Sequence, residues 1–210
     1  MINKKTFVVV IGDLIRSRNI KNRFLVSKKI HDIIKIINRE YMSNIFAPLE
    51  LTKGIDEFSL VLKNPAQSYC ICRAIDEYIY PERYRFAIVK GQLDIGMTSK
   101  NAKTLDGPAF HKAADCLNKI KKTDQRFIFD LGNDCDLLIS EAANLIAIIA
   151  DSRSARQQEI VELYNRYNNQ KKIARKLKIS QQAISDTLKQ ANYRSVLKAI
   201  NSIDAYLAGR

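Results

Sequence analysis

Histidine is scarce in this sequence, with two residues in 210. His31 lies among charged residues, a pattern typical of a solvated helix face. His111 follows a predicted helix start, and a histidine on a helix surface is more often structural than catalytic. Neither histidine is matched with a nucleophile in a recognisable pattern, so the sequence gives no support to catalysis of the Ser-His or Cys-His type.

Cysteine motifs and long apolar runs are also absent. The four cysteines show no C-x-x-C spacing, and Cys70 and Cys72 lie inside an apolar helical pattern, so buried thiols are favoured over zinc ligands or disulfides. No apolar run is long enough to span a bilayer, and residues 1–6 lead into a strand without a cleavage-type site. There is no internal repeat. We therefore expect a cytoplasmic protein without a membrane partner.

Basic residues exceed acidic residues, and the excess is concentrated toward the C-terminus. The chain has 35 Lys and Arg against 22 Asp and Glu, a net charge of +13. Residues 151–210 hold 12 of the basic and 5 of the acidic residues, which is more than half of the excess. The length predicts a medium domain, residues 1–150, followed by a small one, residues 151–210. The charge of the small domain favours a polyanionic partner.

The small domain contains the pattern of two short helices that meet at a sharp turn. Ser180 is placed to cap the second helix, because a serine side chain accepts a hydrogen bond from the first turn. Lys178 occupies the turn position often held by glycine and must therefore adopt a left-handed conformation. Four apolar residues recur at helical spacing, Ile173, Leu177, Ile184 and Leu188. The pattern predicts an all-α helix-turn-helix domain.

The outward-facing side chains of this pattern are of types that contact DNA. Glutamine pairs bidentately with adenine, while serine and lysine reach bases or the phosphate backbone. We expect contacts to double-stranded DNA from Lys171, Lys172, Ser180, Gln181, Gln182, Ser185 and Lys189. A helical hairpin used for packing or dimerisation is the alternative, because the motif alone does not establish a function. The apolar helix predicted over residues 193–207 completes the small core or supplies the seam of a homodimer.

The first 150 residues alternate between strand and helix patterns. The strands are predicted over residues 6–11, 49–53, 58–62, 84–89 continued or paired through 92–97, and 126–131; the helices over residues 22–41, 65–80 and 107–122, with a further helix from about residue 136. The order strand, helix, strand, strand, helix, strand is that of the split βαβ unit found in ferredoxin-like and palm domains. We therefore predict an α+β domain with ferredoxin-like or palm topology.

This topology brings acidic residues from distant parts of the sequence to one sheet edge. A right-handed crossover makes the second strand parallel to the first, so Asp13 and the hairpin residues Asp56 and Glu57 are expected to face one another. Carboxylates in this arrangement bind Mg²⁺, which in turn binds a nucleotide triphosphate. The alternative is that Asp13 serves only as a turn or capping residue, and Asp56 only as a hairpin residue.

Basic residues near this edge are candidates for binding phosphate. Arg16 and Arg18 follow Asp13, and Lys53 precedes the hairpin. The start of the helix at residue 107 is a second candidate for an anion site, with His111 and Lys112 close to it.

Three segments of the chain resemble the SatD family of bacterial proteins. They are residues 12–18 (GDLIRSR), 55–58 (IDEF) and 106–113 (DGPAFHKA), in that order and followed by the helix-turn-helix. The resemblance covers nearly the whole chain. It implies a bacterial cytosolic protein with a regulatory role more than it implies a particular reaction.

A more distant similarity is to the palm domain of nucleotidyl and diguanylate cyclases, where an aspartate after the first strand and an acidic hairpin bind a metal pair. Asp13 and Asp56 match these positions, and residues 55–58 resemble the diguanylate signature with isoleucine in place of its second glycine. His111 and Asp115 stand where the cyclase helix carries an asparagine and an arginine. An acid in place of that arginine opposes the charge on a transferring phosphate. The similarity therefore implies a sensor rather than a cyclase.

Two hypotheses follow from these patterns. In the first, the protein is a DNA-binding transcriptional regulator whose N-terminal domain senses a nucleotide or metal or mediates oligomerisation. In the second, the N-terminal domain is a magnesium-dependent, nucleotidyl cyclase-like enzyme, and the basic tail binds nucleic acid. Asp13→Asn or Asp56→Asn abolishes catalysis under the second hypothesis and leaves the affinity for DNA intact.

Overall fold

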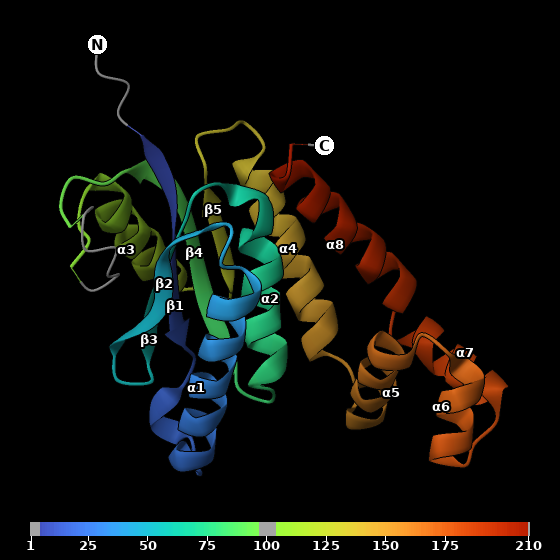
Figure 1. Cartoon of the computed structure of the whole chain (residues 1–210). Helices are drawn as coiled ribbons and strands as arrows, with labels where there is room; N and C mark the ends of the chain where they lie inside the picture. Colours follow the sequence, from blue (N-terminus) through green and yellow to red (C-terminus); the bar gives the residue numbers. More distant parts are fainter. Residues whose placement is uncertain (1–4, 97–103, 210) are drawn as a thin grey trace. The chain divides into compact units, whose positions relative to one another are not determined.

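The computed structural model describes residues 5–96 and 104–209, and within them the chain forms a five-stranded sheet and eight α-helices (Figure 1). The chain divides into two compact units. The first comprises the residues up to 141 together with those from 204 onward, and the second comprises residues 142–203. The division falls inside α4 (Asp136–Asp151), whereas the sequence pattern placed a boundary near residue 150, where this helix ends.

The sheet of the first unit contains the predicted split βαβ arrangement. Its strands are β1 (Thr6–Leu14), β2 (Ile45–Lys53), β3 (Glu57–Leu62), β4 (Tyr84–Gln92) and β5 (Phe127–Asp130). The spatial order is β2-β3-β1-β4-β5, in which the first four strands are antiparallel to their neighbours and β5 is parallel to β4. The ends of β1 and β2 therefore lie at the same edge, with the β2–β3 hairpin beside them.

Three helices cover the two faces of this sheet. They are α1 (Arg23–Glu40), α2 (Ser68–Tyr78) and α3 (Pro108–Ile120). The apolar positions that recur at helical spacing in α1 and its C-cap are residues 26, 30, 33, 37 and 41; the first four are buried, and Tyr41 at the C-cap is half-buried. Residues 7, 9 and 11 of β1 pack with α3, so residues 8 and 10, which are also fully buried, face the other side of the sheet. Figure 1 shows α1 and α2 on the side of the sheet opposite α3.

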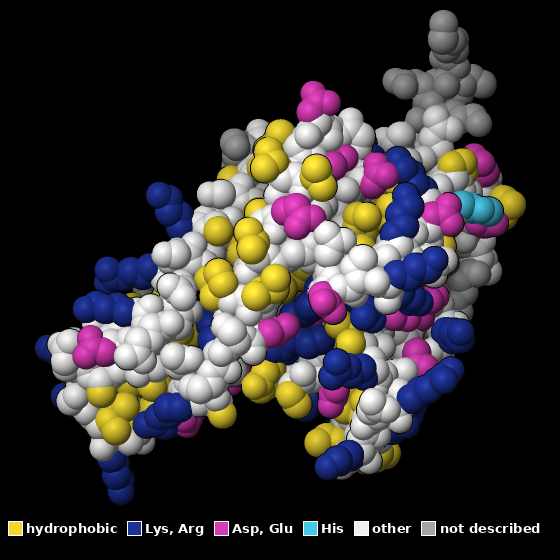
Figure 2. All heavy atoms as spheres, turned by 180° about the vertical axis from the view of Figure 1, so that it is seen from behind, with side chains coloured by type: hydrophobic (Ala, Val, Ile, Leu, Met, Phe, Trp, Pro, Cys, Tyr) yellow, Lys and Arg dark blue, Asp and Glu magenta, His cyan; other side chains and the backbone are white. Residues whose placement is uncertain are grey.

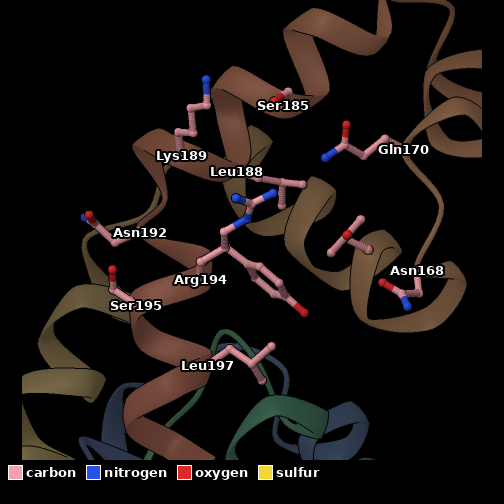
Figure 3. Close-up of a pocket in the computed structure, with 11 residues that line it drawn as sticks. Asn168, Gln170, Ser185, Leu188, Lys189, Asn192, Arg194, Ser195 and Leu197 are labelled. Carbon is pink, nitrogen blue, oxygen red and sulfur yellow. The ribbon is translucent and has the colours of Figure 1, made fainter.

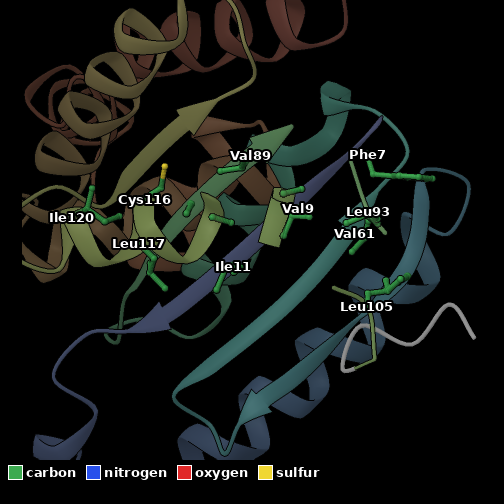
Figure 4. Close-up of a cluster of buried hydrophobic side chains, with 14 residues drawn as sticks. Phe7, Val9, Ile11, Val61, Val89, Leu93, Leu105, Cys116, Leu117 and Ile120 are labelled. Carbon is green, nitrogen blue, oxygen red and sulfur yellow. The ribbon is translucent and has the colours of Figure 1, made fainter. Parts of the chain in front are cut away.

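The core between the sheet and α3 is made of aliphatic and small side chains. Val9, Val61 and Val89 from three adjacent strands meet Leu117 and Ile120 from α3 (Figure 4). The helix can approach closely because its inward positions 109 and 113 are alanine. This packing fixes where the C-terminal end of α3 lies over the sheet, which matters for the charged residues described below.

The end of β1 differs from the sequence-based prediction. The strand was expected to stop at Gly12, but it continues through Asp13 to Leu14. Gly12 serves packing rather than a turn, because a Cβ at this position would lie 2.2 Å from the Phe58 ring. Asp13 is therefore a strand residue with a fixed direction, and its interpretation as a turn residue is wrong.

A second correction concerns the strand predicted over residues 92–97. The strand β4 continues without a break through Gly91 and ends at Gln92. Beyond it, the described residues form only an isolated bridge between Ile95 and Asp106, and position 97 lies outside the described residues.

The second unit contains the helices α5 (Ala155–Tyr167), α6 (Gln170–Leu177) and α7 (Gln181–Gln190), with most of α8 (Tyr193–Leu207). Its core joins α5, α6 and α7 through Ile160, Val161, Ile173, Ala174, Ile184, Leu188 and Ala191. The apolar residues of α8 at positions 196, 200, 203 and 207 are also buried within a single chain. Among the described residues, no helix is long and apolar enough to cross a membrane.

Candidate functional site

Asp13 lies at the edge of the sheet where the sequence predicted it, beside Glu57 of β3. The two residues are directly paired across the antiparallel strands, and Arg85 of β4 is paired with Asp13 on its other side. Residues directly opposite one another in a sheet share a face, so all three side chains lie on the face covered by α3. Of the two hairpin acids expected to face Asp13, the structure pairs Glu57 with it across the strands.

The carboxylate of Asp13 is engaged by two cations of the same unit. Lys121, which follows the last residue of α3, places its Nζ 2.9 Å from one carboxylate oxygen, and the Arg85 guanidinium lies 3.9 Å from the other. Only 18% of the Asp13 side chain is exposed. In the described arrangement, a metal ion at Asp13 would therefore compete with Lys121 for the same oxygen.

Asp56 lies in the hairpin turn and not on the face that holds Asp13. Its carboxylate is 3.5 Å from the guanidinium of Arg23, and its backbone carbonyl accepts a hydrogen bond of 2.7 Å from the Leu14 amide. Glu57 accepts a hydrogen bond of 3.1 Å from the Thr52 hydroxyl. Among residues 5–96 and 104–209, no three His, Cys, Asp or Glu side chains are grouped as metal ligands, so the metal role of these three acids stays a prediction.

Tyr84 lies close to both Asp13 and Asp56. Its hydroxyl donates a hydrogen bond of 2.9 Å to the carbonyl of Ile55 in the hairpin turn. Burial, together with the nearby charges of Asp56 and Asp13, raises the pKa of the Tyr84 hydroxyl. The tyrosine therefore remains a neutral donor that holds the turn against the sheet.

The same face of the sheet contains polar atoms without hydrogen-bond partners. Ser59 is 2% exposed and its hydroxyl bonds to no described atom; Glu50, opposite Ser59 on β2, and Arg85 each bury one such atom as well. Buried polar atoms in proteins are nearly always satisfied, if necessary by water or a ligand. The sheet edge therefore has spare hydrogen-bonding capacity.

The predicted phosphate-binding residues of the first unit are distributed over several places. Arg16, in a left-handed conformation, lines a cavity of about 380 Å³ together with Lys21, Lys29 and the acidic residue Glu82. Arg18 and Lys53 do not line this cavity; Arg18 is exposed in a short 3₁₀ helix, and Lys53 is exposed at the end of β2. The structure thus places Arg16 among cations that the sequence-based prediction did not include.

The start of α3 supplies its own anionic groups. His111 lies 2.9 Å from the carboxylate of Asp106, whose other contact is a hydrogen bond of 2.7 Å from the Gly107 amide. Lys112 donates a hydrogen bond of 2.7 Å to Asp130 of β5. Both predicted phosphate-binding side chains therefore have a carboxylate of the same chain as partner, and their phosphate role stays a prediction.

In the second unit, α6 and α7 form the two short helices expected from the sequence. The residue between them, Lys178, is left-handed with φ 54°, as the pattern required. Asn169 caps α6, and Ser180 caps α7 by accepting a hydrogen bond of 3.0 Å from the Ala183 amide. Ile184 and Leu188 are buried against Ile173 and other core residues.

The side chains expected to contact DNA are placed on the outside of these two helices. Lys171, Lys172, Ser180, Gln181, Gln182 and Lys189 are exposed, and Ser185 is half-buried. Gln182 donates a hydrogen bond of 2.9 Å to Asp186, which also lies 3.7 Å from Lys189. The structure therefore brings all seven residues onto one two-helix unit, although their contact with DNA stays a prediction.

Two of the three α6 lysines lie against an aromatic ring rather than against acids. The ammonium groups of Lys172 and Lys176 are 4.2 Å and 5.5 Å from the centre of the Tyr167 ring. Lys176, with Arg166 beside it, lowers the pKa of the Tyr167 hydroxyl. Within the described part of the chain, none of the basic residues of α6 forms an ion pair, so this surface keeps its positive charge.

The family model that matches this chain is that of the SatD family, over residues 7–205. The chain belongs to the SatD family. The match includes both units, in agreement with the resemblance seen in the sequence. Two solved structures of a bacterial light-regulated adenylyl cyclase are also similar to this SatD-family chain, each with 13% sequence identity and a TM-score of 0.43.

These similarities cover 59% of the SatD-family chain and 42% of each cyclase chain, so this chain spans less than half the length of the cyclase chains that it matches. A search of curated proteins finds no match. The family model establishes membership in the SatD family. Because these comparisons do not establish a function, the function is inferred from the geometry of this chain.

Sequence reasoning missed the basic partners of the acids in this SatD-family protein. Arg85 and Lys121 contact Asp13, and Arg23 contacts Asp56. The strand register places Arg85 opposite Asp13, and the packing of α3 brings Lys121 to the same carboxylate. Neither the register nor the helix packing can be deduced from the sequence pattern alone. One available signal was Arg23, which directly follows residue 22, the predicted start of this helix and the N-cap of α1 in the structure.

Proposed function

We propose that this SatD-family protein is a DNA-binding transcriptional regulator that reads double-stranded DNA with a helix-turn-helix made of α6 and α7. The observation that carries the proposal is the division of α7 into two faces. Ile184 and Leu188 are buried against α6, whereas Gln181 and Gln182 are exposed at the first turn. In helix-turn-helix proteins, the first residues of the second helix reach base edges in the major groove.

The charge of the unit supports a DNA phosphate backbone as its partner. The basic residues of α6 form no ion pair among the described residues, and Lys171 and Lys172 lie at the start of this helix. On the face shown in Figure 2, dark-blue basic side chains predominate over magenta acidic ones in the second unit. Phosphate contacts from such lysines position a protein on DNA, and the α7 glutamines supply the base contacts.

The proposal assigns the first unit a sensing role for a phosphate-bearing ligand or its metal ion. Support comes from the carboxylates of Asp13 and Glu57 on one sheet face, the unsatisfied polar atoms of Ser59 and Arg85 near them, and the basic cavity at Arg16. Magnesium-dependent nucleotidyl transfer is the alternative. In either role a metal ion at Asp13 would have to displace Lys121 from the carboxylate, so nucleotide turnover, measured below, distinguishes the two.

The test is fluorescence anisotropy of a duplex DNA pool against the full chain over a range of salt concentrations. We expect binding that weakens steeply with salt, since each phosphate contact contributes about −0.9 to the slope of log affinity against log salt. The double variant Lys171→Gln, Lys172→Gln should reduce the slope by about two. As a control, Lys28→Gln, Lys35→Gln removes two exposed lysines of α1 and should leave the slope unchanged.

Sequence reading is tested on a duplex enriched from the pool. Gln181→Ala should lower the affinity for this duplex by about 1 to 3 kcal/mol and leave the affinity for unrelated duplexes unchanged. Failure of the full chain to bind any duplex at low salt would overturn the proposal and favour a packing or dimerisation role for α6 and α7.

The sensing role of the first unit is tested with nucleotide. ATP or GTP with Mg²⁺ should shift the DNA affinity without being consumed, and Asp13→Asn should remove the shift. Nucleotide turnover that Asp13→Asn abolishes would establish the enzyme alternative instead.

A further inference from the structure

We propose that a cavity in the second unit, between α7 and the start of α8, binds a small organic anion. The cavity has a volume of about 420 Å³ and is lined by eleven residues, all of the second unit. Figure 3 shows that α7 contributes Ser185, Leu188 and Lys189, and that α8 contributes Arg194 and Leu197. This volume lies in the range of about 300 to 1,000 Å³ that is typical of small-molecule sites.

The cavity offers an apolar and partly aromatic lining. The rings of Tyr164 and Tyr193 meet edge to face, with their centres 5.1 Å apart. The Tyr193 hydroxyl donates a hydrogen bond of 2.9 Å to Asn165, which fixes the direction of its ring. Leu188 is buried beneath the cavity, and Leu197 is 40% exposed, a large exposure for a leucine in a packed helix. A compact aromatic or aliphatic body would cover these side chains.

The charge of the cavity selects a negatively charged ligand. Lys189 and Arg194 line it, and no aspartate or glutamate does. Arg194 forms no ion pair with any described residue, and its guanidinium projects toward Leu188 and Gln170 (Figure 3). The amide of Gln170 and the hydroxyl of Ser195 add hydrogen-bonding groups at the rim. The ligand class is therefore a compact apolar body that carries one carboxylate, sulfonate or phosphate group.

The position of the cavity connects ligand binding to DNA binding. Ser185 and Lys189 line the cavity and also belong to the proposed DNA-binding surface. A ligand anion paired with Lys189 would remove this lysine from a DNA phosphate, so ligand and DNA each lower the affinity of the other, by the same factor. This regulatory consequence rests on the proposed function, whereas the ligand site itself does not.

The experiment is a fluorescence titration of the full chain with anilinonaphthalene sulfonate, an aromatic anion whose emission rises on transfer to an apolar site. We expect saturable binding of one probe molecule per chain. Arg194→Gln should weaken it at least about tenfold, which corresponds to the loss of one charged pair. Ser195→Trp fills the cavity and should abolish binding, with far-UV circular dichroism checking that the variant is folded. Lys198→Gln, on α8 and outside the cavity, is the control and should bind like the unmodified chain.

Two outcomes overturn the ligand site. One is probe binding that neither Arg194→Gln nor Ser195→Trp changes, which places the probe elsewhere. The other is a loss of DNA affinity in Arg194→Gln with unchanged probe binding, which would show that Arg194 contacts a DNA phosphate and not a small ligand. If the probe binds in an Arg194-dependent manner and no duplex binds, the ligand site stands and the DNA-binding proposal fails. If duplex binds and the probe does not, the reverse holds.

Discussion

The ion-paired residues of the first unit and the basic residues of α6 in the second unit of this SatD-family protein differ in how their charges are used. In the first unit, acidic and basic side chains neutralise one another: Asp13 with Lys121, Asp76 with Arg126, and Lys112 with Asp130. In the second unit, the basic side chains of α6 form no ion pair among the described residues. Figure 2 shows the same contrast, with blue and magenta side chains intermixed over the first unit. Charges of the first kind hold a fold together, whereas charges of the second kind remain available to a partner.

This comparison has a consequence for mutation. Removing one member of an ion pair in the first unit leaves the other without that opposite charge, so the loss should appear in the free energy of unfolding. Removing a charge from α6 leaves no acidic partner behind among the described residues, so the loss should appear in binding. Each prediction below tests one side of this contrast or the packing that supports it.

The largest effect is expected at Asp76 of α2. Its carboxylate contacts Arg126, whose side chain is 8% exposed. The same carboxylate lies 3.7 Å from the Arg83 guanidinium and accepts a hydrogen bond of 3.1 Å from the Tyr84 amide. Asp76→Ala leaves a buried guanidinium without its carboxylate, so we expect a loss of about 3 to 5 kcal/mol in the free energy of unfolding. Urea denaturation followed by circular dichroism measures this loss.

The matched control for this prediction is Asp115→Ala on α3. Asp115 is exposed and forms no ion pair within the described residues, so its removal should change the unfolding free energy by no more than about 0.5 kcal/mol. Equal losses at Asp76 and Asp115 would contradict the structural role of the buried pair.

The next effect concerns the packing that fixes the sheet edge. Gly12→Ala places a methyl group 2.2 Å from the ring of Phe58, which is 2% exposed. Overpacking of this kind costs about 1 to 3 kcal/mol. Thermal unfolding of Gly12→Ala should show this loss, and Gly91→Ala, where the new methyl group would be 3.1 Å from Ala109, should lose less.

A double variant makes this test specific. Because the clash is with the Phe58 ring, Gly12→Ala combined with Phe58→Leu should cost less than the sum of the two single substitutions. Additive costs would show that Gly12 is required for the backbone of β1 and not for the ring of Phe58.

Sequence patterns predicted the helices of this protein well because helical periodicity is strong. The apolar residues that recur at helical spacing in α2 and its C-cap, at positions 69, 72, 75 and 79, are all buried, as are the four of α8. The predicted apolar helix over α4 also forms, but Leu137, Leu138 and Leu145 on it are more than half exposed. The period identifies a helix, and it does not decide how much of an almost wholly apolar helix becomes buried.

Strand ends and the partners of the acids were harder to predict. Glycine marks both turns and close packing, and Gly12 lies within β1 although the pattern treated it as the end of the strand, whereas β4 does continue across Gly91, as one of the two predicted alternatives had it. Pairing of Asp13 with Glu57 followed from topology, whereas its contact with Lys121 depends on how α3 packs. Topology can be deduced from the order of elements, but side-chain partners across elements require three-dimensional packing.

The same substitution in each unit tests the contrast directly. Lys121→Gln removes a partner 2.9 Å from Asp13, in a pair that is 35% and 18% exposed, so we expect a loss of about 0.5 to 1 kcal/mol in unfolding free energy. Lys171→Gln should leave the unfolding free energy unchanged and weaken DNA binding. Urea denaturation and anisotropy on both variants measure the two quantities. The prediction would be contradicted if Lys171→Gln lowered the unfolding free energy while Lys121→Gln weakened DNA binding.

The smallest effect is a gain in stability at Lys178, between α6 and α7. A left-handed conformation costs a residue with a Cβ about 1 to 2 kcal/mol, and glycine loses about 0.5 to 1 kcal/mol more backbone entropy on folding. With φ at 54°, Lys178→Gly should therefore raise the unfolding free energy by about 0.5 kcal/mol, measured by urea denaturation. Arg175→Gly, inside α6, should instead lower it by about 1 kcal/mol. If both substitutions lowered the unfolding free energy equally, contacts of the Lys178 side chain would stabilise the turn by more than its left-handed backbone costs.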